Sequence, residues 1–334
     1  MFLKHEHLPT ISASEIAVWK QCRQKWYWQY CLRLQPAVTH TKLAQGTMAH
    51  AGIEAALKRD NVWIAVRKSS VQQRRSLNLS LGDQVFEEEL EEVNAVAACV
   101  SKWAVESLEL SGINAHSTEV TWEQPLRDGK RKMTGVTWNG RMDAILSSGW
   151  GLEAKYVGRF RSQESIDLSS QLAMYLLYLG AAQAGTPQLL YLQILNKMPA
   201  VPSVNKSGGM SRSQISTDWK TYREAVEDNG YDAADYLDMQ EKLAGKVFWR
   251  EQVITRPAER LAEDRAALYD VSVDLMAKNK RIYMCDSPFL CTSCQFKELC
   301  LESVRGRDPQ NLVESGAFVS RDKPSEEAEP ETAE

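Results

Sequence analysis

Residues 117–157 change the pattern of the chain from helical to strand-like, and this change limits the fold more than any other feature. Three runs rich in β-branched and aromatic residues occur there, STEVTWEQPL, MTGVTWNGRMDAIL and GWGLEAKYV, with the turn-like segments RDGK and SSGW between them. They predict an antiparallel meander of three or four strands. Because helical patterns lie on both sides of the meander, we expect one α/β unit in which helices flank a mixed central sheet, with helical additions at both ends.

The flanking segments are assigned from spacing and local signals. Apolar residues recur at helix-like intervals before and after the meander, and a short, fully apolar run is typical of a buried strand. The predicted elements are a serine-capped helix at 12–31, a helix continuing after Gly46, a helix at 84–110, a helix at 165–185, a strand at 187–195, a loop at 198–216, and mostly helix at 217–285 with a short strand at 247–254.

Acidic residues stand out in the last two runs of the meander. Glu153 and Lys155 are two positions apart, so both side chains project from one face of their strand, and the hairpin can bring Asp143 back against that face. Two converging carboxylates suit Mg²⁺ or Mn²⁺, and an adjacent lysine can stabilise charge that develops on a phosphate. An isolated E-x-K is more often a solvated ion pair, and Asp143 makes the two interpretations about equally good.

Two helices add polar residues at helical spacing. Gln171 and Tyr175 are four residues apart and share a face beside an apolar stripe, where a glutamine is unexpected. His50 and Glu54 have the same spacing on the helix that follows Gly46. A single histidine is more often structural, but a neutral imidazole is also a common metal ligand.

The charge of the chain bears on whether the protein can bind nucleic acid. The net charge of −4 is entirely that of residues 321–334, an acidic segment that we expect to be disordered, so nucleic-acid binding depends on local basic groups. Taken singly, each group is more often a solvated face. The basic groups are Arg67, Lys68, Arg74 and Arg75, then Lys130, Arg131 and Lys132, then Arg159 and Arg161.

No apolar run approaches the roughly 20 residues of a membrane span, and the first residues lack a secretory core, so we expect a cytoplasmic protein of a bacterial or phage-infected cell. Seven cysteines there favour free thiols or metal ligands over disulfides.

The order of these motifs resembles the PD-(D/E)XK nuclease superfamily, and more closely its RecB-type branch. The resemblance rests on G-x3-H-x3-E in one helix, an Asp before a turn, E-x-K, and Q-x3-Y in a helix, and it covers most of residues 12–300. It implies a restriction-endonuclease-like core. His50, Asp143, Glu153 and the backbone carbonyl of Ala154 would be metal ligands, Lys155 the catalytic lysine, and Gln171 and Tyr175 would position the DNA backbone or the lysine.

The cysteines near the end of the chain fit the same resemblance. CTSCQFKELC spaces three of them as C-x2-C-x5-C, whereas a thiolate site normally has four ligands. Nucleases of CRISPR adaptation and AddB-type nucleases carry a [4Fe-4S] cluster whose first cysteine lies far upstream. The implied ligands are Cys22, Cys291, Cys294 and Cys300, which would join the two ends of the core. Cys31 or Cys285 could replace Cys22, and zinc would also accept four thiolates. Cys99 lies in an apolar helix and is expected in the core.

The resulting functional hypothesis is a Mg²⁺- or Mn²⁺-dependent deoxyribonuclease. This branch suggests an exonuclease acting on single strands or DNA ends in recombination, replication or repair, as in phage RecB-like exonucleases. Six residues are candidate DNA contacts: Lys20, Arg23, Lys25, Trp26, Arg159 and Arg161. The tryptophans of this helix, Trp19, Trp26 and Trp28, could equally pack in the core. No nucleotide-binding P-loop occurs, so unwinding would need a partner, such as a helicase, and a recombinase or annealing protein is a further candidate.

Other functions remain open at this point. One is a non-catalytic iron–sulfur module that binds DNA or serves as a scaffold in a recombination or CRISPR adaptation complex. Another is a hydrolase acting on RNA or nucleotides, because the chemistry takes place at the phosphodiester. An oligomer is also compatible with the resemblance.

The predicted organisation has four parts. They are an N-terminal helical segment with the first cluster cysteine (1–45), a nuclease core (46–200) with a helical insertion at about 58–110, a helical C-terminal part with the other cysteines (201–302), and a disordered acidic tail (303–334).

Overall fold

The computed structural model describes residues 10–37, 41–76, 83–108, 113–127, 133–182, 185–213, 216–277, 280–285 and 287–320. The predicted basic group at 130–132 and the predicted disordered residues 321–334 lie outside these ranges.

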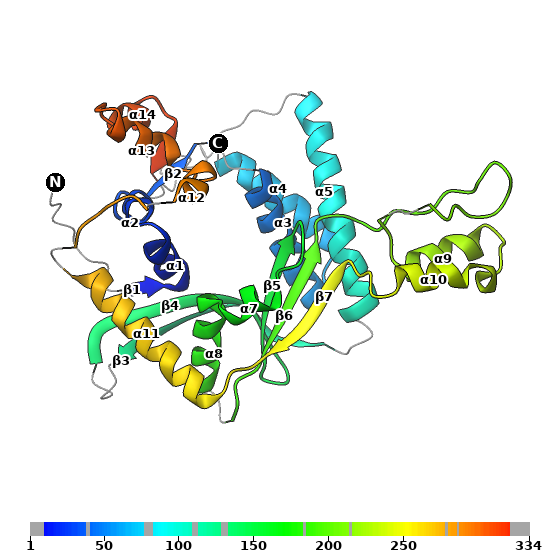
Figure 1. Ribbon diagram of the computed structural model, residues 1–334, viewed down its shortest axis with the longest axis horizontal. Helices are drawn as coiled ribbons and strands as arrows, with labels where there is room; N and C mark the ends of the chain where they lie inside the picture. The colour runs from blue at the N-terminus through cyan, green and yellow to red at the C-terminus, as the bar shows by residue number, and fades with distance from the viewer. Residues whose placement is uncertain are drawn as a thin grey trace, which may run out of the picture.

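A mixed six-stranded sheet forms the centre of the molecule (Figure 1). The strand order is β1-β4-β5-β6-β7, and β3 pairs with β4 outside this path. β1 runs parallel to β4 and β5 parallel to β6, whereas the other neighbours are antiparallel. The strands are β1 (Thr10–Ser12), β3 (Ala115–Arg127), β4 (Met133–Leu146), β5 (Gly151–Val157), β6 (Leu189–Leu195) and β7 (Trp249–Ile254). The predicted meander and α/β fold are confirmed.

Helices cover both faces of this sheet (Figure 1). On one face, Leu152 and Ala154 of β5 pack in a core with α3 (Thr41–Leu57), α4 (Val62–Ser76) and α5 (Asp83–Trp103), which continues as a π-helical turn, η2 (Ala104–Leu108). Cys99 is buried in this core, as predicted. On the other face lie α8 (Ser170–Ala182), α1 (Ala13–Gln21) and α11 (Ala258–Met276). Because strand residues alternate, Glu153 and Lys155 project from the α8 face.

The predicted helix at 12–31 is broken at Cys22 and changes to a π-helical turn near its end. Ser12 caps α1, as expected, by accepting a hydrogen bond from the backbone N–H of Glu15. Cys22 is extended (φ −164°, ψ 115°) and separates α1 from α2 (Arg23–Trp26), which passes into the π-helical turn η1 (Tyr27–Cys31). The break at Cys22 frees its thiol to cap α2, where Sγ lies 3.4 Å from the N–H of Lys25.

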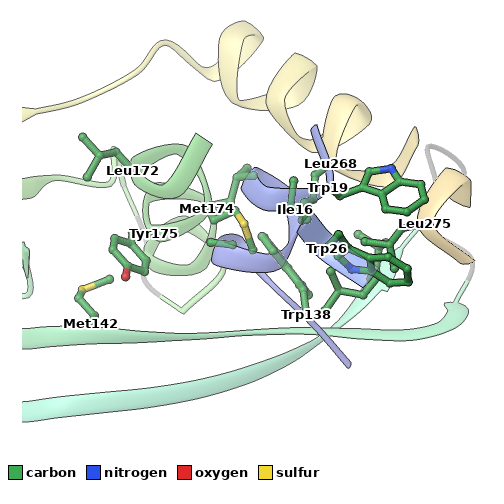
Figure 2. Close-up of a cluster of buried hydrophobic side chains, with 14 of the residues drawn as sticks. Ile16, Trp19, Trp26, Trp138, Met142, Leu172, Met174, Tyr175, Leu268 and Leu275 are labelled. Atoms are coloured by element: carbon green, nitrogen blue, oxygen red, sulfur yellow. The ribbon is translucent and has the colours of Figure 1, made fainter. Parts of the chain in front are cut away.

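The aromatic side chains of this N-terminal segment pack in the core (Figure 2). Trp19 and Trp26 are 4% exposed and Trp28 is 8% exposed, so core packing accounts for all three. Trp19 and Trp26 meet edge to face, and their indole N–H groups donate to Asp274 and Glu15 respectively.

The predicted helix at 165–185 is also interrupted. A short α7 (Gln163–Asp167) ends before α8 begins at Ser170. The buried guanidinium of Arg256 donates to the backbone carbonyls of Asp167 and Ser169, at 2.5 and 3.1 Å, and pairs with Asp264 of α11 at 2.5 Å. Arg256 therefore holds the break and fixes the start of α8.

The C-terminal part returns to the N-terminal segment (Figure 1). It contains α12 (Pro288–Thr292), α13 (Lys297–Val304), α14 (Gln310–Glu314) and β8 (Phe318–Ser320). β8 pairs with β2 (Leu34–Pro36), and Phe318 stacks on Phe296. Residues 303–320 are therefore ordered, unlike the prediction that the disordered tail begins at 303, because a strand pairing and an aromatic contact hold them.

A small helical module lies beyond β7 at one edge of the sheet (Figure 1). It consists of α9 (Trp219–Asp228), the 3₁₀ turn η3 (Ala233–Tyr236) and α10 (Leu237–Leu243), and has its own core around Tyr222. Among the described helices, none combines the length and apolarity needed to cross a bilayer.

Candidate active site

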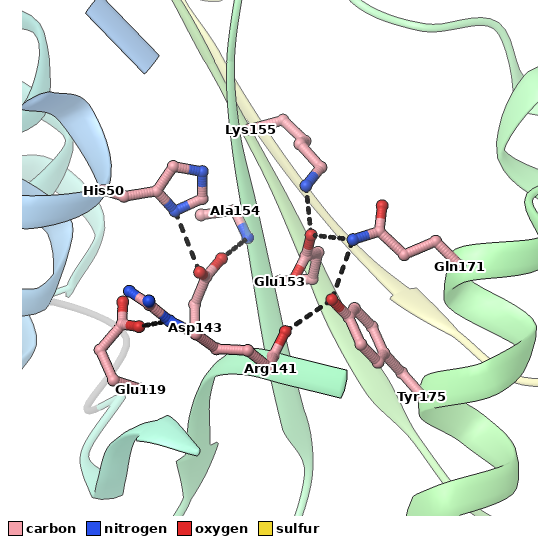
Figure 3. A network of polar contacts seen from close by, with 9 residues as sticks. All are labelled: His50, Glu119, Arg141, Asp143, Glu153, Ala154, Lys155, Gln171 and Tyr175. Atoms are coloured by element: carbon pink, nitrogen blue, oxygen red, sulfur yellow. Dashed lines mark hydrogen bonds and ion pairs between the residues drawn. The ribbon is translucent and has the colours of Figure 1, made fainter. Parts of the chain in front are cut away.

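The acidic side chains meet where β4 and β5 separate. The two strands pair only through Ala144–Leu152 and Ile145–Gly151. Asp143 comes directly before the paired residue Ala144 in β4. Its side chain reaches β5, where its Oδ2 accepts a hydrogen bond of 2.6 Å from the N–H of Ala154. The carboxylate takes the place of a backbone partner and is thereby fixed beside Glu153 (Figure 3).

Glu153 and Lys155 form an ion pair on the α8 face of β5, through Glu153 Oε1 and Lys155 Nζ. The Glu153 side chain is 3% exposed and that of Lys155 is 22% exposed. A solvated surface pair would be far more open, so the structure does not favour that interpretation of the E-x-K motif.

His50 approaches from the opposite side, on α3 (Figure 3). Its Nδ1 lies 3.0 Å from Asp143 Oδ1, and its side chain is 31% exposed. The predicted residues His50, Asp143, Glu153 and Lys155 therefore converge, although they come from a helix and two strands.

Gln171 and Tyr175 complete the network from α8 (Figure 3). Gln171 Nε2 donates to Glu153 Oε1 at 3.2 Å and to the hydroxyl of Tyr175 at 2.9 Å. The Tyr175 hydroxyl in turn donates to the backbone carbonyl of Arg141 at 2.7 Å. A glutamine on an apolar helix is explained by this contact with a buried carboxylate.

The environment drives the pKa values of the two carboxyls apart. Burial opposes ionisation of Asp143, but the hydrogen bonds from His50 and Ala154 and the charges of His50 and Lys155 together hold its pKa below the usual value. Burial, followed by the charge of Asp143, raises the pKa of Glu153 to about 7. Burial disfavours the charged form of His50 and of Lys155, yet the neighbouring carboxylates raise both pKa values. Burial also raises the pKa of Tyr175.

Three further charged residues surround the network. Arg141, two residues before Asp143, forms an ion pair with Glu119 of β3, and Glu119 has a left-handed backbone (φ 52°). Glu54 accepts hydrogen bonds from Lys58 and Thr118. The spacing from His50 indicated Glu54 without assigning it a role. Nothing in the sequence placed Glu119 here, because its position depends on the β3–β4 register.

An open cavity of about 570 Å³ adjoins this network. Gln171, Tyr175 and Arg141 form one wall, and Ser12 and Trp122 belong to the others. A ligand that enters this cavity therefore meets the network at Gln171 and Tyr175, whereas Asp143, Glu153 and Lys155 are not among the lining residues.

The donor set fits a divalent cation. Repulsion between Asp143 and Glu153 is the kind that a cation relieves, and carboxylate, imidazole and carbonyl groups suit Mg²⁺ or Mn²⁺. Among the described residues, however, no three of His, Cys, Asp and Glu are arranged so that they could hold a metal ion. The carboxylates bond instead to His50 and Lys155.

Five cysteines share a second pocket, of about 320 Å³, at the junction of the N- and C-terminal parts. They are Cys22, Cys285, Cys291, Cys294 and Cys300. Sγ of Cys285 lies 3.7 Å from Sγ of Cys291, and the N–H of Cys285 is 3.3 Å from Sγ of Cys22. The fourth implied cysteine thus lies with the C-x2-C-x5-C group. Cys285 is a fifth candidate, which its separation of six residues from Cys291 made plausible.

Cys31 lies elsewhere. Its charged neighbours are Lys280 and Glu15, and burial raises the pKa of its thiol to about 12. Within the cysteine pocket, burial raises the pKa of Cys300 to about 11, with the other thiols Cys294, Cys22 and Cys291 as further causes.

The predicted DNA contacts fall into different environments. Lys20, Arg159 and Arg161 are exposed. Arg23 pairs with Asp274 and stacks on Trp19 and Tyr283, whereas Lys25 bonds to Gln21. Trp26 is buried. Arg67, from another predicted basic group, is paired with Glu89.

Three comparisons with known proteins bear on the family of this chain. Similarity to the crystal structure of SSO0001 extends over 88% of this chain and 87% of that chain at 14% identity, but the TM-score of 0.33 is too low to support an argument. The comparison with curated proteins gives no match. The sequence profile of the PD-(D/E)XK nuclease superfamily matches residues 10–301, which include all the residues of the network. This chain belongs to the PD-(D/E)XK nuclease superfamily.

Proposed function

We propose that the protein is a divalent-metal-dependent deoxyribonuclease whose active site is the network around Asp143, Glu153 and Lys155. One observation carries the proposal: two carboxylates and a lysine from diverging strands meet in a buried, hydrogen-bonded group beside an open cavity. Membership of the superfamily supports the same chemistry. His50, Asp143, Glu153 and the carbonyl of Ala154 would hold the cation. When bound, it would supply Lewis acidity to the scissile phosphate.

The remaining groups act on the substrate or on one another. Lys155, held by Glu153, donates hydrogen bonds to the phosphate as negative charge develops on it. Gln171 donates to Glu153 and to the hydroxyl of Tyr175, and that hydroxyl donates to the carbonyl of Arg141. This chain of hydrogen bonds keeps Glu153 in place. Burial of Glu153 excludes water from the carboxylate and strengthens these interactions.

The substrate is proposed to be a single strand or the end of a duplex, cut as an exonuclease of the RecB type cuts it. The motif order supports this branch. Of the six residues that the sequence offers as DNA contacts, three are exposed: Lys20, Arg159 and Arg161. A helicase, recombinase or annealing protein as partner remains a prediction. Assembly into an oligomer and the domain boundaries at 45 and 200 remain predictions too.

We also propose that the cysteine pocket holds a [4Fe-4S] cluster. Its support is the convergence of Cys22 with Cys291, Cys294 and Cys300, a soft thiolate set separated by more than 260 residues of chain. Zinc is the alternative occupant, and Cys285 the alternative to Cys22. Iron, acid-labile sulfide and zinc contents of anaerobically purified protein distinguish these cases.

The decisive experiment is digestion of end-labelled single-stranded and duplex DNA, with RNA as a competitor, in Mg²⁺ or Mn²⁺. Wild type is compared with Lys155→Ala and with Lys102→Ala, a lysine that is likewise ion-paired and partly buried but lies outside the network. We expect cleavage by wild type and Lys102→Ala, and a loss of about 10²–10³-fold in Lys155→Ala.

The same assay separates the competing functions. If none of the three proteins cuts while all bind DNA, the non-catalytic module replaces the nuclease. Preferential cleavage of RNA would assign the site to RNA. The position of the label in the products gives the polarity of digestion.

A further inference from the structure

A basic, aromatic pocket of about 490 Å³ lies where the helical module joins the sheet. It is formed by the turn after β5, the end of β6, the start of β7 and both connections of the module (Figure 1). Lys197, Lys246 and Arg250 line it together with Phe160 and Phe248, and none of its lining residues is acidic. The function proposed above does not use this pocket.

The three cations of this pocket have no acidic partner among the residues that the structure describes. Within the described part of the chain, Lys197, Lys246 and Arg250 form no ion pair, whereas other basic residues such as Arg23 and Arg256 are paired. Lys197 and Arg250 lie instead over aromatic rings, 5.9 Å from the centroid of Phe248 and 4.7 Å from that of Phe160. Unpaired cations in a concave surface create a positive potential that attracts anions.

The neighbouring carboxylate is turned away from them. Glu251 follows Arg250 in β7, but its Oε1 accepts hydrogen bonds from Trp103 and Ser107. Those residues belong to the helices on the opposite face of the sheet, so Glu251 does not neutralise the pocket.

The strand register places the pocket beside the catalytic network. Lys155 pairs with Gln193 of β6, and Gln193 pairs with Arg250 of β7, so the three side chains share one face. Two strand spacings separate the backbones of Lys155 and Arg250 by about 10 Å. The buried Gln193 accepts a hydrogen bond of 2.8 Å from the N–H of Arg161 and thereby fixes the turn that carries Phe160.

We propose that this pocket binds a single strand of DNA next to the nucleotide held at the active site. Lys197, Lys246 and Arg250 contact phosphates, and an unpaired base stacks on Phe160. Stacking on an aromatic face beside backbone cations is how single strands are held without sequence preference. Arg159 and Arg161, which flank Phe160 and are exposed, extend the same path toward the active site. This inference rests on the proposed function, because it takes the strand from that site.

Fluorescence anisotropy with a labelled 20-nucleotide single strand, with Mg²⁺ and Mn²⁺ omitted so that nothing is cut, tests the assignment. The variant is the triple Lys197→Ala, Lys246→Ala, Arg250→Ala. The control is Lys206→Ala, Lys242→Ala, Arg260→Ala, which removes equal charge from exposed positions outside the pocket. We expect the variant to bind at least about ten-fold more weakly, with a salt slope smaller by about 2. The control should retain its affinity and slope.

Phe160→Leu separates stacking from charge, since it keeps the bulk but removes the aromatic face. We expect it to weaken strand binding by at least about five-fold without changing the salt slope. Melting curves confirm that each variant folds. If the triple variant and Phe160→Leu bind the strand as the control does, the pocket is not part of the DNA path. If the triple variant loses affinity only for a nucleoside monophosphate, the pocket holds free nucleotides and the proposal is wrong.

The two proposals fail separately. Wild type that cuts DNA while the triple variant binds it normally overturns the pocket and keeps the nuclease. Wild type that cuts nothing, combined with weak strand binding by the triple variant, overturns the nuclease and keeps the pocket.

Discussion

The acidic network and the cysteine pocket are organised in opposite ways. Around Asp143 and Glu153, each polar side chain already has a protein partner, and the contributing elements are adjacent in one sheet-and-helix unit. The cysteine pocket joins residue 22 to residues 285–300, and its contacts are few: two backbone N–H groups near Sγ of Cys22 and one short Sγ–Sγ approach. The fold alone prepares the first site, whereas the proposed cluster would join the separate parts of the second.

Replacing Asp143 is expected to have the largest effect, confined to activity. Asp143→Asn removes a carboxylate from the proposed cation site, and loss of even an indirect partner of a metal typically costs 10–100-fold. We expect cleavage to fall by at least about 100-fold. The asparagine carbonyl can still accept from Ala154, so the melting midpoint should stay within about 2 °C of wild type.

Calorimetry beside the nuclease assay checks this result. A large fall in the melting midpoint of Asp143→Asn would mean that the carboxylate holds the fold together, and the contrast between the two sites would disappear.

In the cysteine pocket, by contrast, we expect a substitution to lower the melting midpoint. Cys294→Ser would remove one ligand of the proposed cluster, which would link distant segments of the chain. Losing such a cross-link costs about 2–5 kcal/mol, or roughly 4–10 °C in a chain of this size. The control is Cys31→Ala, a thiol outside the pocket. Removal of Mg²⁺ or Mn²⁺ by a chelator should change the midpoint much less.

Metal and sulfide analysis of both cysteine variants accompanies the melting curves. Equal losses in Cys294→Ser and Cys31→Ala would contradict the assignment of the pocket, as would an unchanged midpoint in both. Cys285→Ser measured in the same way decides whether the fifth thiol is a ligand.

The smallest effect concerns the support of Glu153. Tyr175→Phe removes the hydroxyl that links Gln171 to the carbonyl of Arg141, which should lower the free energy of unfolding by about 1 kcal/mol and activity by up to about ten-fold. Tyr178→Phe is the matched control, since its ring lies on the same helix and its hydroxyl has no protein partner in the described residues. Equal effects of the two substitutions would show that Tyr175 contributes only its ring.

Local patterns predicted most of the fold. Alternation and turn residues indicated β3, β4 and β5, and an unbroken apolar run indicated β6. Both helix breaks were missed for a tertiary reason. Cys22 is extended where its thiol faces the C-terminal part, and the break before Ser170 is held by Arg256, 86 residues further along the chain. Propensity does not contain such contacts.

The residues of the candidate site also divide into those that local spacing predicted and those that depend on tertiary contacts. His50, Asp143, Glu153, Lys155, Gln171 and Tyr175 follow regular spacings, and their convergence agrees with the prediction. The register between separate strands decides the rest. Glu119 reaches the network because its neighbours Thr118 and Val120 pair with β4, and Arg250 lies beside Gln193 only through β6–β7 pairing. Trp26 was open to two interpretations, and only the packed structure distinguished the core from the surface.

The distance along the chain between Cys22 and Cys300 has a consequence for synthesis. All strands from β3 to β6 have left the ribosome once residue 195 and the exit-tunnel length have been translated, and they can pair then. The last cysteine follows about 100 residues later, which takes roughly 5–20 s at ordinary elongation rates. During that interval the residues of the acidic network can already be assembled, whereas Cys22 has not yet met the cysteines at 285–300. If the pocket holds the proposed cluster, all four ligands are available for its insertion only after residue 300 has been translated.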